Sequence, residues 1–341
     1  MASLPEHKLI VVTGKGGAGK STIAGALGLL GARGGLRTIV VEVGEQDQLA
    51  RLYDAPTPQP DRKDSGAGRR RALGTEIELE PNLWSLSLDP DLDLIEWMRD
   101  LGGRLPARVL ASSSSFQYLA AAAPGAKELV SLVKLHELSA AGKGRYDLVV
   151  FDAPATGHTL AMLASPRTLR AIVRSSPLAQ RAAEVQEMLD DPIHTGFVAV
   201  ARATEMAVSE TIELEEGLHQ CLDRELDSVV INAVLPRRFT PAEMDRIQRV
   251  ATTGAPSSAV RAAQIVHERG RMQQNQIARL RRHRDSRGAP GSVAAVPFAF
   301  VPEIDRAALE AIAARLMRGL HRNEASSRGT GETSSRNPGS A

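Results

Sequence analysis

The sequence Gly-Lys-Gly-Gly-Ala-Gly-Lys-Ser-Thr at residues 14–22 constrains the fold of this chain more than any other stretch. It follows an apolar run at 9–12 and precedes a segment rich in alanine and leucine at 23–30, whose spacing is helical. Strand, glycine loop and helix form the context in which the pattern G-x-x-x-x-G-K-[ST] indicates a phosphate-binding loop. Glycines let successive backbone N–H groups turn inward onto an anion, where the helix adds the positive end of its dipole. We therefore expect the chain to bind a nucleoside triphosphate.

The residues of this loop have distinct expected parts in nucleotide binding. Lys20 can reach the β- and γ-phosphates, and the Ser21 hydroxyl can bind magnesium. The residues expected to contact the nucleotide are Gly14, Gly16, Gly17, Ala18, Gly19, Lys20, Ser21 and Thr22. A plain strand-to-helix turn also uses glycine, but four glycines and a lysine at this spacing favour a phosphate loop.

The overall composition is that of an ordinary globular protein without a strong charge bias. Hydrophobic residues make up 43% of the 341 residues, and 42 basic residues nearly balance 40 acidic ones. This balance favours no nucleic-acid partner. The single cysteine, Cys221, excludes an internal disulfide and fits a reducing compartment. No apolar run approaches the ~18 residues that span a bilayer, so we expect a cytoplasmic protein.

Apolar, β-branched runs alternate with helical patterns along most of the chain. Strands are expected at residues 9–12, 37–43, 76–79, 83–88, 146–152, 197–201, 228–233 and 293–296, with 76–88 as a hairpin. Helical patterns fill most of the intervals between them, as well as residues 302–320. This alternation predicts an α/β fold with a mostly parallel sheet and helices on both faces.

We expect one domain over residues 1–321. Residues 54–75 are rich in proline, glycine and charge and predict a mobile surface connection. Helical insertions are expected at about 89–138 and 159–190. Residues 322–341 contain no Leu, Ile, Val or Phe and predict a disordered tail.

A second motif follows the strand predicted at 146–152. Asp152 ends this apolar run, where a phosphate-loop enzyme places a carboxylate that supports the magnesium shell. Gly157 lies five residues later, where a backbone N–H can sense a γ-phosphate. The stretch Asp-Ala-Pro-Ala-Thr-Gly-His-Thr-Leu at 152–160 closely resembles the signature of the ArsA and tail-anchored-protein targeting ATPases. The resemblance implies an ATPase that uses ATP and Mg²⁺.

The early lysine of the loop, Lys15, adds to this resemblance. The pattern K-G-G-x-G-K-[ST] resembles the deviant phosphate loop of the MinD, ParA, nitrogenase iron protein and ArsA families. In these families the early lysine reaches across a dimer to the partner's phosphates. The resemblance therefore implies a nucleotide-dependent homodimer, or a heterodimer with a paralogue.

Weaker correspondences extend the resemblance over residues 8–320. The segment 205–211 resembles a family segment that ends in Glu-Thr. Asn232 matches the family asparagine that hydrogen-bonds adenine, and Pro297 begins a stretch that in the family closes over the base.

The chain also departs from the family at two places. Gly44 stands where the family has an aspartate that positions the attacking water, so Glu45 is the first candidate for this part and Glu42 the second. The family's clustered cysteines are absent as well. With Cys221 alone we expect neither a metalloid site nor a structural zinc.

The resemblance points to an ATPase cycle that drives a conformational change, for handling a protein client or membrane partner or for energising anion transport. The alternative is a ParA- or MinD-like positioning switch that binds DNA or membrane. Only the arginine-rich residues 279–287 support this alternative. A small-molecule phosphoryl transferase would share the phosphate loop but not the Thr-Gly-His-Thr stretch.

Overall fold

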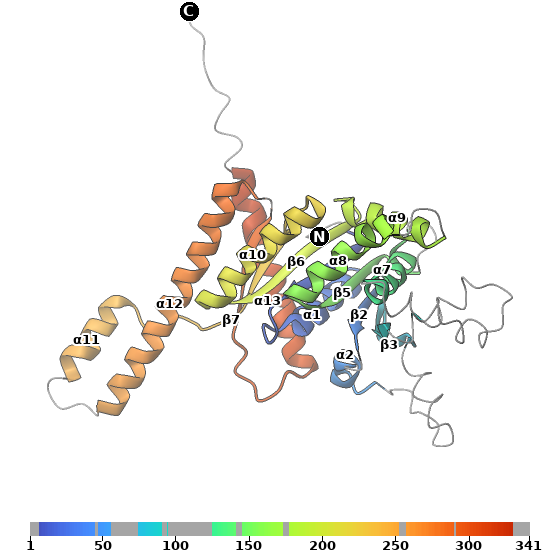
Figure 1. Cartoon of the computed structure of the whole chain (residues 1–341). Helices are drawn as coiled ribbons and strands as arrows, with labels where there is room; N and C mark the ends of the chain where they lie inside the picture. The colour runs from blue at the N-terminus through green and yellow to red at the C-terminus, as the bar shows by residue number, and fades with distance from the viewer. Residues whose placement is uncertain are drawn as a thin grey trace, which may run out of the picture.

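Eight strands form one sheet, in the order β3-β4-β2-β5-β1-β6-β7-β8, in the computed structural model of the chain (Figure 1). The structure describes residues 7–44, 47–55, 74–90, 94, 125–140, 145–172, 177–251, 257–289 and 291–329. The strands are β1 Leu9–Gly14, β2 Thr38–Val43, β3 Ile77–Glu80, β4 Leu83–Leu88, β5 Leu148–Ala155, β6 Thr195–Arg202, β7 Ser228–Val234 and β8 Ser292–Pro297. Neighbours run parallel except β3, which pairs antiparallel with β4. The predicted α/β fold with a mostly parallel sheet is confirmed.

Helices cover both faces of this sheet (Figure 1). They are α1 Lys20–Arg33, α2 Gln48–Leu52, α7 Ala126–Ser139, α8 Thr156–Ile172, α9 Pro177–Asp190, α10 Glu205–Leu222, α11 Pro241–Ala251, α12 Ser257–Arg287 and α13 Arg306–Gly329. α11 and α12 form a helical hairpin that projects away from the sheet (Figure 1).

The alternation of side chains along β1 divides the core into two layers. Leu9 and Val11 pack in the layer that also contains buried residues of α7, α8, α9 and α10. Ile10 and Val12 pack in the other layer, against α1 and α13. All four side chains are fully buried, as expected for a strand covered on both faces.

Glycines on the sheet-facing side of α1 set the distance between this helix and the strands. A Cβ atom at Gly28 would lie 2.3 Å from Val40 Cγ2, and one at Gly31 would lie 2.6 Å from Thr38 Oγ1. Only glycine therefore permits this close approach. It fixes the axis of α1, and with it the position of the helix start beside the end of β1.

The segment expected to be a disordered tail, residues 322–341, is helical in its first part. α13 continues to Gly329, and the remaining residues lie outside the described part of the chain. Glutamate, alanine and two arginines among residues 322–329 have high helix propensity, which agrees with this continuation of α13.

The other expected segments are covered only partly by the described residues. Residues 56–73 of the expected connection at 54–75 lie outside them. Within the insertion expected at about 89–138, the structure describes α7 at its C-terminal end. The insertion expected at 159–190 is made of α8 and α9.

Candidate active site

The strand register brings residues of the two sequence motifs together at the carboxyl edge of the sheet. Val12 of β1 pairs with Asp152 of β5, and Asp152 also pairs with Glu42 of β2. On the other side of β1, Arg202 at the end of β6 pairs with Asn232 of β7. Parallel α/β sheets bind ligands at this edge, beyond the carboxyl ends of their strands.

The phosphate loop requires glycine at two positions for steric reasons. Gly14 has φ +142°, and a Cβ atom there would lie 2.1 Å from the carbonyl oxygen of Val200. Gly19 has φ +92°, and a Cβ atom there would lie 2.2 Å from Asn232 Nδ2. Gly19 is also the N-cap of α1, which has no side-chain cap. The first N–H groups of α1 are therefore left for a ligand such as a phosphate.

Ser21 and Asp152 form the centre of the site. Ser21 Oγ donates a 2.5 Å hydrogen bond to Asp152 Oδ2, while Asp152 Oδ1 is buried without a hydrogen-bond partner in the described residues. Burial raises the pKa of Asp152, against the opposing effects of the Ser21 hydrogen bond and the Lys20 charge. A hydroxyl and a carboxylate with a free buried oxygen are ligands that suit Mg²⁺, so the two residues fit the expected metal.

Glu42 lies buried beside this pair, with a side chain that is only 4% exposed. Its carboxylate accepts hydrogen bonds from the N–H groups of Gln48 and Leu49 at the start of α2, while Oε2 has no hydrogen-bond partner among the described residues. Burial, and next the charge of Asp152, raise its pKa to about 7. Glu42 also lines a pocket of about 370 Å³ together with Ser21 and Thr22.

Of the two candidates for the water-positioning carboxylate, Glu42 is among the described residues and Glu45 is not. Gly44 follows β2 with φ +91° and donates its N–H to the carbonyl oxygen of Leu88. Glu45 lies outside the described residues. Glu42 is thus the candidate whose placement next to Ser21 and Asp152 can be seen.

The motif after Asp152 forms the end of β5 and the first turn of α8. Gly157 is the second residue of this helix, where backbone N–H groups have no partner within the helix. Thr13 Oγ1 donates to Thr159 Oγ1 at 3.0 Å, and Thr159 Oγ1 donates to the carbonyl oxygen of Pro154 at 2.9 Å. These buried hydroxyls join the start of α8 to the end of β1.

Asn232 and Pro297 lie at the ends of β7 and β8. Asn232 Nδ2 donates to the carbonyl oxygen of Ala18 at 2.9 Å, so this side chain supports the phosphate loop. Beyond Pro297, the rings of Phe298 and Phe300 pack edge to face with centroids 4.9 Å apart. The adenine contacts expected for Asn232 and Pro297 remain a prediction.

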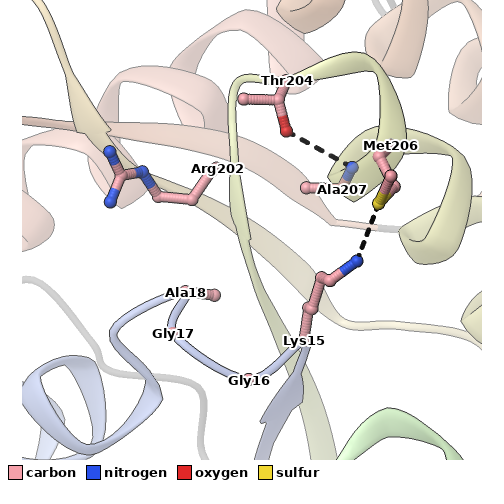
Figure 2. Close-up of a pocket in the computed structure, with 8 residues that line it drawn as sticks. All are labelled: Lys15, Gly16, Gly17, Ala18, Arg202, Thr204, Met206 and Ala207. Carbon is pink, nitrogen blue, oxygen red and sulfur yellow. Dashed lines mark hydrogen bonds between the residues drawn. The ribbon is translucent and has the colours of Figure 1, made fainter.

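Lys15 points away from the rest of its own loop. Figure 2 shows its side chain extending from the loop toward Met206, away from Gly16, Gly17 and Ala18. Lys15 Nζ donates to Met206 Sδ at 2.9 Å and forms an ion pair with Glu210. Both partners belong to α10.

Sequence reasoning assigned no part to Arg202, Met206 or Glu210, although all three lie near the phosphate loop. Arg202 and Met206 line a pocket of about 210 Å³ with Lys15 and residues 16–18 (Figure 2). The resemblance of residues 205–211 to a family segment marked the region. It carried no information on which side chains face the loop.

The described residues contain neither a cluster of metal-binding side chains nor a membrane-spanning helix. They hold no group of three or more His, Cys, Asp or Glu side chains that could bind a metal ion. None of their helices is both long and apolar enough to cross a membrane.

Comparison with known proteins agrees with this geometry. Residues 7–178, just over half of the chain, match the family described as anion-transporting ATPase, ArsA. ATPase BagA from Mycobacterium tuberculosis is 29% identical over 245 residues, which cover 70% of this chain and 68% of that protein. ATPase ASNA1 homolog 1 from Paramecium tetraurelia is 30% identical over 164 residues, which cover 48% of this chain and 44% of that protein.

Proposed function

Because the chain belongs to the ArsA family of anion-transporting ATPases, we propose that two copies close around two ATP molecules and that each Lys15 serves the partner's phosphates. The orientation of Lys15 carries this proposal. Lys20, Ser21 and Asp152 converge within one subunit, whereas the Lys15 ammonium lies on α10 beside Glu210. A site that lacks one of its cations within the subunit is completed by a second copy.

Within each subunit, the residues divide the work of hydrolysis by position. The loop N–H groups and Lys20 hold the β- and γ-phosphates. Ser21 and Asp152 would hold Mg²⁺, which would supply neutralising charge at the phosphates. Glu42, with a pKa of about 7, accepts a hydrogen bond from the attacking water and orients it, unless Glu45 takes this part.

We further propose that the cycle changes the distance or angle between the two subunits, since Gly157 on α8 of one subunit and Lys15 in the phosphate loop of the other respond to the same phosphate. In this proposal the protein is a cytoplasmic homodimer that handles a protein client or a membrane partner, or energises anion transport. The long helices α8, α10 and α12 are the elements that would carry the movement away from the site.

Mixed dimers test the proposal. Lys15→Ala and Asp152→Asn should each be nearly inactive as homodimers. In a mixed dimer, the subunit with intact Asp152 receives an intact Lys15 from its neighbour, so one complete site returns. Random pairing of equal amounts restores about a quarter of all sites. ATPase activity well above the sum of the two variants supports the proposal, and a merely additive activity shows that Lys15 acts within its own subunit.

A further inference from the structure

Two side chains of α10 hold the Lys15 ammonium: Met206 through its sulfur and Glu210 through its carboxylate (Figure 2 shows the first contact). They lie four residues apart, a spacing that places side chains on the same face of a helix. The ammonium therefore contacts one face of α10, at Met206 and Glu210.

The N-terminal part of α10, which carries Met206 and Glu210, is fixed by its cap and its packing. Thr204 caps α10 by accepting a hydrogen bond from the N–H of Ala207, and Ala207 and Val208 are buried against the sheet. β6 and β1 are adjacent strands, so the start of α10 and the phosphate loop keep a fixed separation.

The contact between Lys15 and Glu210 is also easily broken. The two side chains are 41% and 32% exposed, so solvent screens their attraction. Ion pairs of this exposure contribute little to stability, because water screens the two charges. The contact with Glu210 therefore orients the Lys15 side chain but does not prevent its release.

We propose that Glu210 is a positioning residue for Lys15: it keeps the ammonium on α10 in the nucleotide-free subunit and releases it when the partner's phosphates approach. This inference rests on the proposed two-subunit site. An interaction present only in the open state weakens closure by its own free energy. Glu210 therefore opposes premature closure of the dimer and, at the same time, directs Lys15 away from its own phosphates.

Glu210→Gln tests this role through the dissociation constant of the dimer. Sedimentation with a slowly hydrolysed ATP analogue should show that the constant falls about four- to twenty-five-fold, because each of the two Lys15 side chains no longer has to leave a carboxylate, at about two- to fivefold per contact. ATPase activity at low protein concentration should rise accordingly, while activity at saturating concentration stays unchanged. Glu210→Asp should lie between the parent and Glu210→Gln.

Two controls test whether the change in the dimer dissociation constant comes from the contact between Lys15 and Glu210. Glu216→Gln removes the same charge from an exposed position of the same helix and should leave the dimer constant unchanged. In a Lys15→Ala background, Glu210→Gln should have no effect, because there is no ammonium to hold. A dimer constant that rises in Glu210→Gln, or a change that survives without Lys15, overturns the proposal.

A second measurement does not depend on the dimer. The rate at which an acylating reagent modifies Lys15 in the nucleotide-free subunit, followed by peptide mass spectrometry, should rise about two- to fivefold in Glu210→Gln. An unchanged rate shows that Glu210 does not hold Lys15. If the parent protein fails to dimerise with the analogue, the two-subunit site is wrong, and the acylation rate still decides the part played by Glu210.

Discussion

Ser21 on α1 donates a 2.5 Å hydrogen bond to Asp152 on β5, which joins two motifs that lie 131 residues apart in the sequence. The bond exists because β5 pairs with β1 and the phosphate loop returns α1 over the end of both strands. One Asp152 oxygen is taken by Ser21, and the other is buried and free of hydrogen bonds in the described residues.

Replacing Asp152 with asparagine should weaken nucleotide binding only when Mg²⁺ is present, because the amide keeps the shape but loses the charge that supports the metal. We expect magnesium-dependent ATP affinity, measured by calorimetry, to fall tenfold or more, or about 1.4 kcal/mol. Asp147→Asn is the matched control, since Asp147 pairs with Arg37 just before the start of the same strand. Equal losses with and without Mg²⁺ would contradict the assignment.

Lys20→Ala should abolish stable ATP binding, because it removes the one mobile cation that the loop offers to the β- and γ-phosphates within the subunit. Binding of a fluorescent ATP analogue measures the loss. Lys8→Ala provides the control, because Lys8 is exposed just before the other end of β1. An ATP affinity of the Lys20→Ala variant within a few-fold of the parent would contradict the interpretation as a phosphate loop.

Glu42→Gln should slow hydrolysis by about 10²-fold or more while ATP binding changes little, if Glu42 orients the attacking water. Single-turnover measurements separate the two effects. Glu45→Gln is the parallel variant. If only Glu45→Gln loses turnover, the water is positioned by the residue next to Gly44, as first expected from the sequence.

The same Glu42→Gln variant should be more stable than the parent at pH 8 in the absence of nucleotide. A folded-state pKa of about 7 lies above the ordinary value of 4.5. The contribution of this carboxyl is therefore fully present below pH 4.5 and is lost as the pH rises toward and through 7. The gain at pH 8, on the order of 3 kcal/mol, should appear in urea unfolding and shrink at pH 5.

The sequence predicted both motifs that meet at the carboxyl edge of the sheet, because their determinants are local. Glycine spacing, the lysine at position 20 and the apolar run before Asp152 each act within a few residues. The alternation of strands and helices then placed the two motifs at the same edge of a parallel sheet.

The placements that sequence reasoning did not reach depend on tertiary pairing. Glu42 was named as the second candidate for the water-positioning carboxylate, but its place beside Asp152 comes from the register of β2 on β5, which no local pattern specifies. Glu210 meets Lys15 from 195 positions away because β6 adjoins β1. The continuation of α13 through residues 322–329 was not expected, because this segment has no large aliphatic side chain to mark a buried helix face.

Gly19→Ala should disturb nucleotide binding through Asn232. Its Cβ atom would lie 2.2 Å from Asn232 Nδ2, so the asparagine must leave the carbonyl oxygen of Ala18. Gly35→Ala is a matched control, because Gly35 has a similar φ of +87° but open space around its Cβ position. Both variants should lose about 1 kcal/mol of stability from backbone strain. Only Gly19→Ala should lose ATP affinity in calorimetry, and equal affinities would show that the contact is dispensable.

His7 at the start of the described chain should make stability depend on pH. Its Nε2 lies 3.4 Å from Asp227 Oδ1, and this hydrogen bond raises the pKa of His7 above its ordinary value of 6.5 in spite of burial. Because the folded-state pKa is raised, the stabilisation is fully present below pH 6.5 and is lost as the pH rises through the folded-state value. His7→Gln should therefore lower the free energy of unfolding, by up to about 1 kcal/mol, at pH 6 more than at pH 8.

The difference between parent and variant isolates His7 from Glu42, whose contribution changes in the same direction. Asp227 Oδ2 also accepts a 2.7 Å hydrogen bond from the N–H of Phe197, so Asp227→Asn should lose at least as much, and adding His7→Gln to it should remove little more. A loss that is equal at both pH values would mean that His7 packs against Gly196 without its charge being used.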